Sequence, residues 1–334
     1  MSSDAPAAPV APPAELTTPD VWRGPDLAGS AAWRYALSPA EVDELLRARE
    51  APAGKHMSAW TRADFPLPTL GPKIEGWLDE LDRGRGFVLI RGFPVEAHDE
   101  RTCTETYWGI GLHMGRAVSQ NTDGDLVGHI RDVGADPNAY GVRLYKTRAE
   151  QDFHTDGADI IGLFCLHAAK SGGVSRIVSS PAIFNRMVAE RPDLVPVLFQ
   201  SFPFDTQGQQ KPGAKPWFDL PLCRMSEGRM RMFFIPWYIR ESQQHPECPR
   251  LAPAQLEAVE FIERTANDPG LYLDMDFQPG DMQFLKNAAI LHKRTAYEDW
   301  PEPERKCHLL RLWLVQERFS AGEEMLRKGI REEA

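Results

Sequence analysis

Two histidines and one aspartate are the residues of this chain whose types and spacing best suit metal binding. His154 and Asp156 lie two residues apart, just before an apolar stretch that begins at Ile160. In an extended chain, residues two apart point to the same side, so imidazole and carboxylate can bind one ion together. The spacing alone is unspecific, because such pairs also occur as hydrogen-bonded surface residues. A third ligand is therefore needed.

His292 is the candidate for that third ligand. It follows a strand-like stretch, 284–291, which the chain enters through the turn 278–281. Two histidines and one carboxylate on one face form the facial triad that binds Fe(II) and leaves positions open for an organic co-substrate and O2. Three other histidines remain alternatives for the third position: His113, His129 and His167.

The elements that must position these residues are predicted to be mainly short strands. Apolar runs bounded by glycines or turn residues predict strands at 86–92, 160–166, 174–179, 222–225, 230–235, 275–277, 282–285 and 308–315. Apolar residues at helical spacing predict helices at 38–50, 72–83, 107–114, 181–190 and 254–266. Residues 117–140 are rich in Gly, Asp and Asn and predict a long loop region, a feature that is often functional in compact domains.

Many short strands with a few flanking helices favour a mainly β (α+β) fold, a sandwich or jelly roll, over a doubly wound sheet. The 28 prolines among 334 residues, about 8% against a usual ~5%, agree with short strands and frequent turns. The absence of a glycine-rich phosphate loop removes the main support for nucleotide binding. We expect a flexible Ala/Pro-rich tail at 1–30, a single domain at 31–320 with an insertion between about 180 and 270, and a charged tail at 321–334.

The overall charge limits the partners. The chain has 38 Lys and Arg against 48 Asp and Glu, a net charge of −10, which argues against nucleic acid. No apolar run approaches the ~18–20 residues that cross a bilayer, and no basic residue precedes Arg23 as a secretory signal requires. We therefore expect a cytoplasmic protein with a small-molecule substrate, no membrane partner, and monomeric or homo-oligomeric assembly. Its five cysteines contain no CxxC pair and are expected to be buried thiols.

Several motifs follow one another along the chain: 153–156 (FHTD), 169–175 (AKSGGVS), 279–281 (PGD) with Asn287, 291–296 (LHKRTA) and 308–314 (HLLRLWL). In this order and spacing they resemble the TauD/TfdA-type Fe(II)/2-oxoglutarate-dependent dioxygenases, over roughly residues 86–315. The resemblance implies a double-stranded β-helix core, which is a cupin-like jelly roll. It also implies catalytic iron ligands at His154, Asp156 and His292, with Fe(II), 2-oxoglutarate and O2 as cofactor and co-substrates.

One position departs from the family pattern. The family usually binds 2-oxoglutarate with a Ser or Thr after the Gly-Gly turn, here Ser175, and with the first of two arginines on the last core strand. Arg311 matches the second arginine, but Cys307 occupies the first position, and a thiol cannot pair with a carboxylate as a guanidinium does. Three alternatives remain open: Arg311 takes this role, Arg305 on the same face takes it, or 2-oxoglutarate is bound weakly or not used.

The resemblance implies oxidation of an unactivated C–H bond of a small, charged molecule, coupled to conversion of 2-oxoglutarate to succinate and CO2. Fold and triad do not decide between hydroxylation, desaturation and cyclisation. A same-fold Fe(II) oxygenase that does not use 2-oxoglutarate and a non-catalytic jelly-roll binding protein remain alternatives.

Arg294 is expected to be structural, bound to a carboxylate such as Asp299. Substrate contacts are expected at 120–121, 143–147, 216–220, 237–238 and Arg240.

Overall fold

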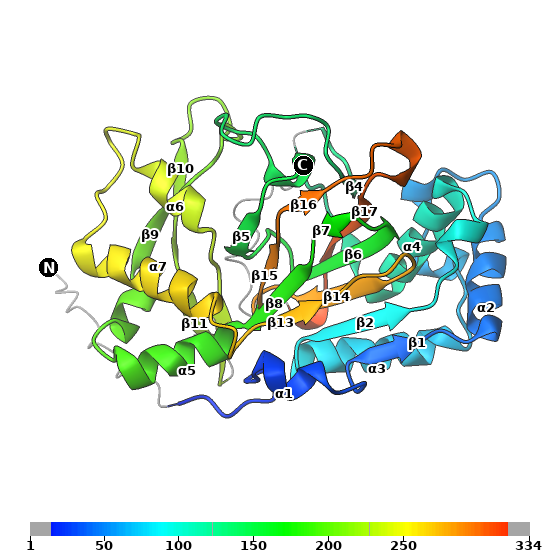
Figure 1. Cartoon of the computed structure of the whole chain (residues 1–334), viewed down its shortest axis with the longest axis horizontal. Helices are drawn as coiled ribbons and strands as arrows, with labels where there is room; N and C mark the ends of the chain where they lie inside the picture. Colours follow the sequence, from blue (N-terminus) through cyan, green and yellow to red (C-terminus); the bar gives the residue numbers. More distant parts are fainter. Residues whose placement is uncertain (1–14, 122, 227, 320–334) are drawn as a thin grey trace, which may run out of the picture.

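A computed structural model describes residues 15–121, 123–226 and 228–319 and shows two β-sheets at its centre (Figure 1). The seven strands of the larger sheet are β1 (Arg34–Ala36), β2 (Phe87–Arg91), β3 (Arg116–Ala117), β4 (Val127–Ile130), β6 (Ile160–His167), β14 (Met282–Lys286) and β17 (His308–Val315). The smaller sheet comprises β5 (Gln151–His154), β8 (Ser175–Ser179), β13 (Leu273–Met275) and β15 (Ile290–Arg294). A short pair, β7 (Ser171–Gly172) with β16 (Tyr297–Glu298), lies outside both.

The strand order brings chain segments that are distant in sequence next to one another. The larger sheet runs β1-β2-β14-β6-β17-β3, with β4 also paired to β17, and the smaller runs β13-β8-β15-β5. β5 and β6 are consecutive in the chain but belong to different sheets, so the turn between them crosses from one sheet to the other. This turn carries Asp156.

The larger sheet is buried on both faces, which sets the direction of the side chains of β17. Leu310 and Leu312 pack in a cluster with residues of the helices, whereas Trp313 packs in the cluster that joins the two sheets. Because successive side chains of a strand point to opposite faces, Arg311 lies on the same face as Trp313. The arginine therefore points toward the smaller sheet and away from the helices.

Most of the helices lie in two groups at opposite ends of the molecule, and the N-terminal helix lies between the groups (Figure 1). They are α1 (Gly24–Ala28), α2 (Pro39–Glu50), α3 (Leu70–Arg83), α4 (Glu100–Met114), α5 (Ser180–Glu190), α6 (Pro236–Ser242) and α7 (Pro253–Ala266). α2, α3 and α4 pack against the larger sheet through one apolar cluster. α2 begins with a capping box, in which Ser38 and Glu41 are bonded to each other's backbone. α4 begins seven residues before its predicted start, because its polar first turn carries no apolar periodicity.

The insertion between β8 and β13 forms a separate layer at one end of the sheets. It adds the hairpins β9 (Ser201–Asp205) with β10 (Trp217–Pro221) and β11 (Cys223–Ser226) with β12 (Arg229–Met232) to α5, α6 and α7. Buried aromatic residues fill the space between these elements: Phe184, Phe202, Phe204, Phe233, Phe234 and Phe261. The same cluster includes Phe153, Val178 and Leu291 of the smaller sheet, so the insertion packs onto that sheet and supports the segment that reaches the site.

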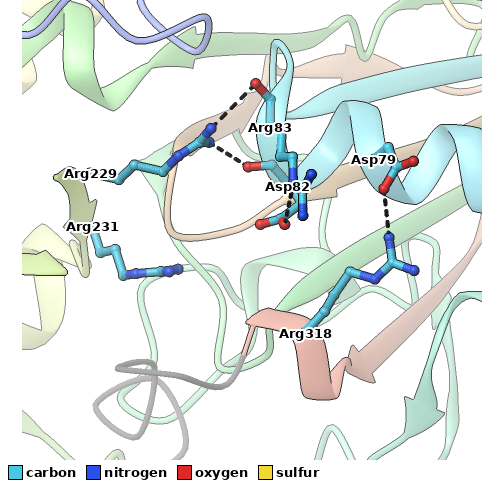
Figure 2. Close-up of a pocket in the computed structure, with 6 residues that line it drawn as sticks. All are labelled: Asp79, Asp82, Arg83, Arg229, Arg231 and Arg318. Carbon is cyan, nitrogen blue, oxygen red and sulfur yellow. Dashed lines mark hydrogen bonds and ion pairs between the residues drawn. The ribbon is translucent and has the colours of Figure 1, made fainter. Parts of the chain in front are cut away.

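A charged cavity of about 460 Å³ marks where the β11–β12 hairpin meets the C-terminal end of α3 (Figure 2). The Arg229 guanidinium donates to the carbonyl oxygens of Asp82 and Arg83 in the last turn of α3. Arg318 pairs with Asp79 at 2.9 Å. Arginines at a helix C-terminus satisfy its free carbonyls and its negative dipole end. These contacts attach the insertion and the chain after β17 to the same helix.

Several boundaries differ from the sequence predictions. The flexible tail was expected to reach residue 30, but Leu16 and Trp22 are buried and α1 is helical, so this is wrong for residues 15–30. Asn185 bonds to both the amide and the carbonyl of Leu16 at 2.8 Å, which explains the ordering. Residues 1–14 and the predicted charged tail at 321–334 lie outside the described residues. The predicted loop at 117–140 contains β4.

Two further expectations concern the cysteines and membrane-spanning helices. All five cysteines are buried thiols without a disulfide partner. Within the part of the chain that the structure describes, no helix combines the length and the apolar character of a membrane span.

Glu41 allows a test of how α2 is attached to α3 and β1, because its carboxylate accepts hydrogen bonds from Lys73 and Tyr35. Burial alone would raise the pKa of Glu41, but hydrogen bonds from Lys73 and Tyr35 outweigh it and lower the pKa from 4.5 to about 2. The native state therefore keeps a carboxylate that the unfolded chain protonates near pH 4.5. We expect Glu41→Gln to lower the free energy of unfolding at pH 7, and its difference from the wild type to shrink between pH 4.5 and 2.

Urea unfolding at several pH values measures this difference. Glu50→Gln, at the exposed end of the same helix, is the control and should show little effect. A Glu41→Gln difference that stays constant down to pH 2 would contradict the assignment.

Candidate functional site

The structure brings His154, Asp156 and His292 together. β5 and β15 pair so that His154 lies directly opposite His292, with ring centroids 4.2 Å apart. The Asp156 carboxylate lies 3.8 Å from Nε2 of His154 and 3.6 Å from Nε2 of His292. One ligand atom of each residue lies within 4.8 Å of the others, and the three residues are at most 8% exposed.

The His154 ring is oriented by its own strand. Nδ1 lies 2.7 Å from the carbonyl oxygen of Asp152, so Nδ1 donates and Nε2 keeps its lone pair. The side-chain amide nitrogen of Gln151 lies 3.0 Å from this Nε2, where it donates to the lone pair. Burial, and next the neighbouring His292, lower the pKa of His154 to about 3. The imidazole is therefore neutral near pH 7, the form that binds metals.

Asp156 is held as a carboxylate by its surroundings. Its Oδ2 accepts from Nη1 of Arg311 at 3.2 Å and from Nε1 of Trp313 at 3.0 Å. Burial alone would raise the pKa of Asp156, but the Arg311 guanidinium and the two imidazoles hold it far below its usual range. Two imidazole nitrogens and one carboxylate on one side are the donor set of non-haem Fe(II), so these residues fit that ion.

The turn that carries Asp156 is fixed from two sides. Asn287 accepts from the amide of Asp156 at 2.8 Å and donates to the carbonyls of Asp156 and Ala158 at 2.7 and 2.8 Å. On the other side, the amide of Thr155 donates to the carbonyl of Phe234 at 2.8 Å, and Phe234 donates back to the Thr155 hydroxyl at 2.9 Å. The insertion and the β14–β15 turn thus both position the carboxylate.

A cavity of about 1230 Å³ opens beside the triad, with His154 and Asp156 on its wall. Four cationic side chains line it: Arg143, Lys211, Lys215 and Arg311. Besides Asp156, two carboxylates line it, Asp205 and Glu241. Its aromatic walls are Tyr140, Tyr145, Trp217, Phe218, Phe233, Trp237, Tyr238 and Trp313. The cavity can therefore hold a small molecule that has both polar and apolar parts.

Most of the segments expected to contact substrate reach this cavity. Residues 120–121, 143–145, 217–218 and 237–238 line it, whereas Arg240 points away and pairs with Glu263. Sequence reasoning missed other parts of the wall, among them 137–142, 205–211 and Gln151. The first begins inside the predicted 117–140 loop, and the second belongs to a polar run that carries no apolar periodicity. Their composition predicts loops, but it does not show that these loops lie against the cavity.

The three residues predicted to bind 2-oxoglutarate lie in different surroundings. Arg311 is 6% exposed and lines the cavity, with its Nε 2.7 Å from the side-chain oxygen of Gln120. Arg305 lies in a 3-10 turn before β17 and stacks on Trp300, outside the cavity wall. The prediction that Arg305 shares a strand face with Arg311 is wrong, because the strand begins only at residue 308. Ser175 is buried on β8 and does not line the cavity.

Cys307 and Arg294 lie next to each other behind the cavity wall. The Cys307 amide donates to Asp299 at 2.8 Å, and burial raises the pKa of its thiol to about 12. Arg294 donates to the carbonyls of Thr147 and Ala149 at 2.8 and 2.6 Å. Arg294 is thus a structural residue as predicted, but it binds backbone carbonyls instead of the Asp299 carboxylate. It holds the segment that leads into β5.

The other histidines weighed as third ligand lie away from the triad. Nε2 of His113 lies 2.7 Å from the carbonyl oxygen of Phe65, inside the helical layer. His129 contacts His308 at 2.9 Å, and His167 is exposed at the end of β6. Geometry therefore leaves His292 as the residue that joins His154 and Asp156.

The sheet arrangement and the triad define a non-haem iron oxygenase. The chain matches the family model described as taurine catabolism dioxygenase TauD, TfdA family, over residues 49–313. It belongs to this family and is an Fe(II)/2-oxoglutarate-dependent dioxygenase, with Fe(II) and 2-oxoglutarate as cofactor and co-substrate.

Known proteins with similar sequences or folds agree with this membership. The chain is 29% identical to FR-33289 synthase of Streptomyces rubellomurinus (strain ATCC 31215), over 90% of each chain. It is 31% identical to the taurine hydroxylase-like protein SAT17 of Stachybotrys chartarum, over 87% of this chain and 77% of that one.

Two solved structures share the fold at low sequence identity. Asparagine oxygenase in complex with Fe(II), 2S,3S-3-hydroxyasparagine and succinate has a TM-score of 0.64 at 13% identity, covering 84% of this chain and 93% of that one. The non-haem iron oxygenase OrfP in complex with Fe, succinate and (3S)-hydroxy-L-Arg has a TM-score of 0.62 at 16% identity, covering 84% and 94%.

Asn287 allows a test of how the turn positions the carboxylate. Asn287→Ala leaves three buried backbone groups without partners, so we expect the free energy of unfolding to fall by about 2–4 kcal/mol. We also expect Co(II), used as a probe, to bind about 10–100-fold more weakly, the usual effect of losing an outer partner. Urea unfolding and the visible absorption of bound Co(II) measure the two effects.

Asn185→Ala is the matched control, since Asn185 also bonds a backbone amide and carbonyl, those of Leu16, away from the triad. It should lower stability and leave Co(II) affinity unchanged. Equal Co(II) affinity in both variants would show that Asn287 does not position the ligand.

Proposed function

We propose that this chain oxidises an unactivated C–H bond of a small, charged molecule, with iron held by His154, Asp156 and His292. The observation that carries the proposal is the convergence of these three residues beside a cavity that has His154, Asp156 and the Arg311 guanidinium on its wall. When bound, Fe(II) supplies the activation of O2 that side chains lack. The residues of the chain supply its position, the exclusion of water and the orientation of the substrate.

The strand order supports the double-stranded β-helix of the family as the core. In this interpretation the smaller sheet, β13-β8-β15-β5, faces the strands β14, β6, β17 and β4 of the larger one. The apolar cluster with Leu285, Ile177 and Trp313 fills the space between them. His154 lies at the end of β5, where the chain crosses between sheets, so the metal would sit at the open end of the core.

Arg311 is the residue we propose for a carboxylate of 2-oxoglutarate. A guanidinium pairs with two carboxylate oxygens at once, and this one lies beside the proposed metal ligand Asp156. Gln120 bonds both the Arg311 side chain and its carbonyl, and Tyr145 stacks on the guanidinium at 4.8 Å, so the group is preorganised. Arg305 and Cys307 do not line the cavity, which leaves Arg311 as the cation nearest the triad. Ser175 stays a prediction as a second contact.

The substrate is proposed to carry an anionic group that binds the remaining cations of the cavity. Arg143 contacts the Tyr238 hydroxyl, and Lys211 and Lys215 lie on the exposed part of the wall. The Trp237 ring meets His154 edge-on at a centroid distance of 5.1 Å and covers the metal side of the cavity. The complexes of asparagine oxygenase and OrfP contain hydroxylated amino acids, which supports hydroxylation as the outcome.

Anaerobic addition of Fe(II) and 2-oxoglutarate tests the co-substrate assignment. We expect a visible charge-transfer band, and about 10–100-fold weaker 2-oxoglutarate binding in Arg311→Gln, because a hydrogen-bonded charge pair is worth about 1.5–3 kcal/mol. Arg305→Gln should bind 2-oxoglutarate like the wild type. Iron binding without a band would favour an oxygenase that does not use 2-oxoglutarate, and no iron binding would contradict any oxygenase activity.

Succinate release in the presence of small molecules tests the substrate assignment. We expect small carboxylates, sulfonates or phosphonates to stimulate release more than neutral analogues of the same size. For a stimulating anion, Arg143→Gln should raise KM about tenfold or more with a smaller change in kcat, since it removes one charged contact. Lys146→Gln, on the same segment but outside the cavity wall, is the control. Preference for neutral compounds would overturn the proposal of an anionic group.

A further inference from the structure

A second group of potential metal ligands lies outside the cavity, where β17 begins. Glu100 is the first residue of α4, His129 belongs to β4, and His308 is the first residue of β17. Nδ1 of His129 lies 2.9 Å from Nε2 of His308. The Glu100 carboxylate lies 3.8 Å from Nδ1 of His129 and 3.9 Å from Nδ1 of His308, which is the other nitrogen of the His308 ring. One ligand atom of each residue lies within 4.8 Å of the others.

Strand register and helix packing explain why these three residues meet. β4 pairs with β17 so that His129 lies opposite Leu310, and His308 precedes Leu310 by two residues on the same face. Leu310 packs in the cluster that contains residues of α4, so this face is the one that α4 covers. The helix starts at Glu100, directly after its N-cap Asp99, and this start lies over the two imidazoles.

We propose that Glu100, His129 and His308 form a site for a divalent transition metal, with Zn²⁺ the ion that best matches the donors. Tetrahedral zinc takes imidazole nitrogen and carboxylate oxygen at about 2.0–2.2 Å, and water can complete the coordination. Such bonds place two ligand nitrogens about 3.3 Å apart, so the histidine nitrogens must separate by only about 0.4 Å. The Glu100 side chain is 55% exposed and has room to approach the ion.

The charges around the cluster are compatible with a cation. In the metal-free pair one ring must donate a proton to the other, and a metal ion would replace that proton. Burial, then the neighbouring His129 and Arg131, lower the pKa of His308 to about 4, so its ring is neutral near pH 7. Arg131 and the exposed His167 are the other basic groups near His308. The Glu100 carboxylate offsets their repulsion of a cation.

The proposed zinc site would lie behind Arg311 without touching the cavity. His308 and Arg311 belong to the same strand but to opposite faces, since residues three apart alternate. A metal bound to β4, β17 and the start of α4 would tie these three elements together at the end of the strand that carries Arg311. Its role is structural, and it does not depend on the proposed reaction.

The test separates this site from the triad. We use the full chain with His154→Ala and Asp156→Ala, dialyse it against Zn²⁺ and measure bound metal by mass spectrometry. About one zinc ion per chain is expected. Adding His129→Ala or Glu100→Gln, both on partly exposed side chains, should weaken zinc binding at least about tenfold. His56→Ala, an exposed histidine elsewhere, should have no effect.

Thermal unfolding with and without zinc provides a second measurement of binding at this site. Zinc should raise the melting temperature of the chain without the triad, but not after His129→Ala. If the triad substitutions prevent folding, the intact chain should bind two zinc ions and its His129→Ala variant one. No zinc bound beyond the triad, or zinc binding in the His129→Ala and Glu100→Gln variants as tight as in the parent chain without these substitutions, would overturn the proposal.

Discussion

The Asp156 carboxylate is buried, and a buried charge is stable only where opposite charges and hydrogen-bond donors surround it. Arg311 and Trp313 from β17 supply the charge and one donor, and the two histidines face it from the smaller sheet. Much of the surrounding fold follows from this requirement. β17 must present these side chains on the inner face, and β5 and β15 must pair at the register that places His154 opposite His292.

The turn that carries Asp156 belongs to neither sheet, so its conformation depends on contacts from outside. Asn287 binds it from the β14–β15 turn, and Phe234 binds Thr155 from the insertion. The insertion is in turn attached to α3 through Arg229 and to the smaller sheet through a shared apolar cluster. Rigidity at the triad thus comes from three regions that are far apart in the chain, which suits a site whose ligands must hold their geometry before metal binds.

The fold and the triad could be predicted to different depths. The apolar runs of β2, β6 and β17 identified strands, and the spacing of His154 and Asp156 indicated a candidate ligand pair, because both signals are local. His292 needed the motif order of the family, since pairing across 138 residues leaves no local signature. Arg305 was misplaced because strand alternation was extended before residue 308, where the chain is in a turn. The polar segment 205–211 and Gln151 were missed because only tertiary packing brings them to the cavity.

Different elements position the triad and line the cavity. This separation determines which substitutions can change the cavity without changing the triad. The triad and Arg311 belong to the two sheets and the turn between them, whereas Lys211, Lys215, Trp217 and Tyr238 belong to the insertion. The insertion reaches the ligand turn through few residues, chiefly Phe234 and Trp237. Lys211 and Lys215 are exposed, so substitutions there are expected to change the cavity wall more than the triad, whereas buried residues of the insertion share an apolar cluster with Phe153 and Leu291, the neighbours of His154 and His292. Specificity can therefore change at these exposed positions of the wall while the geometry of the triad is kept.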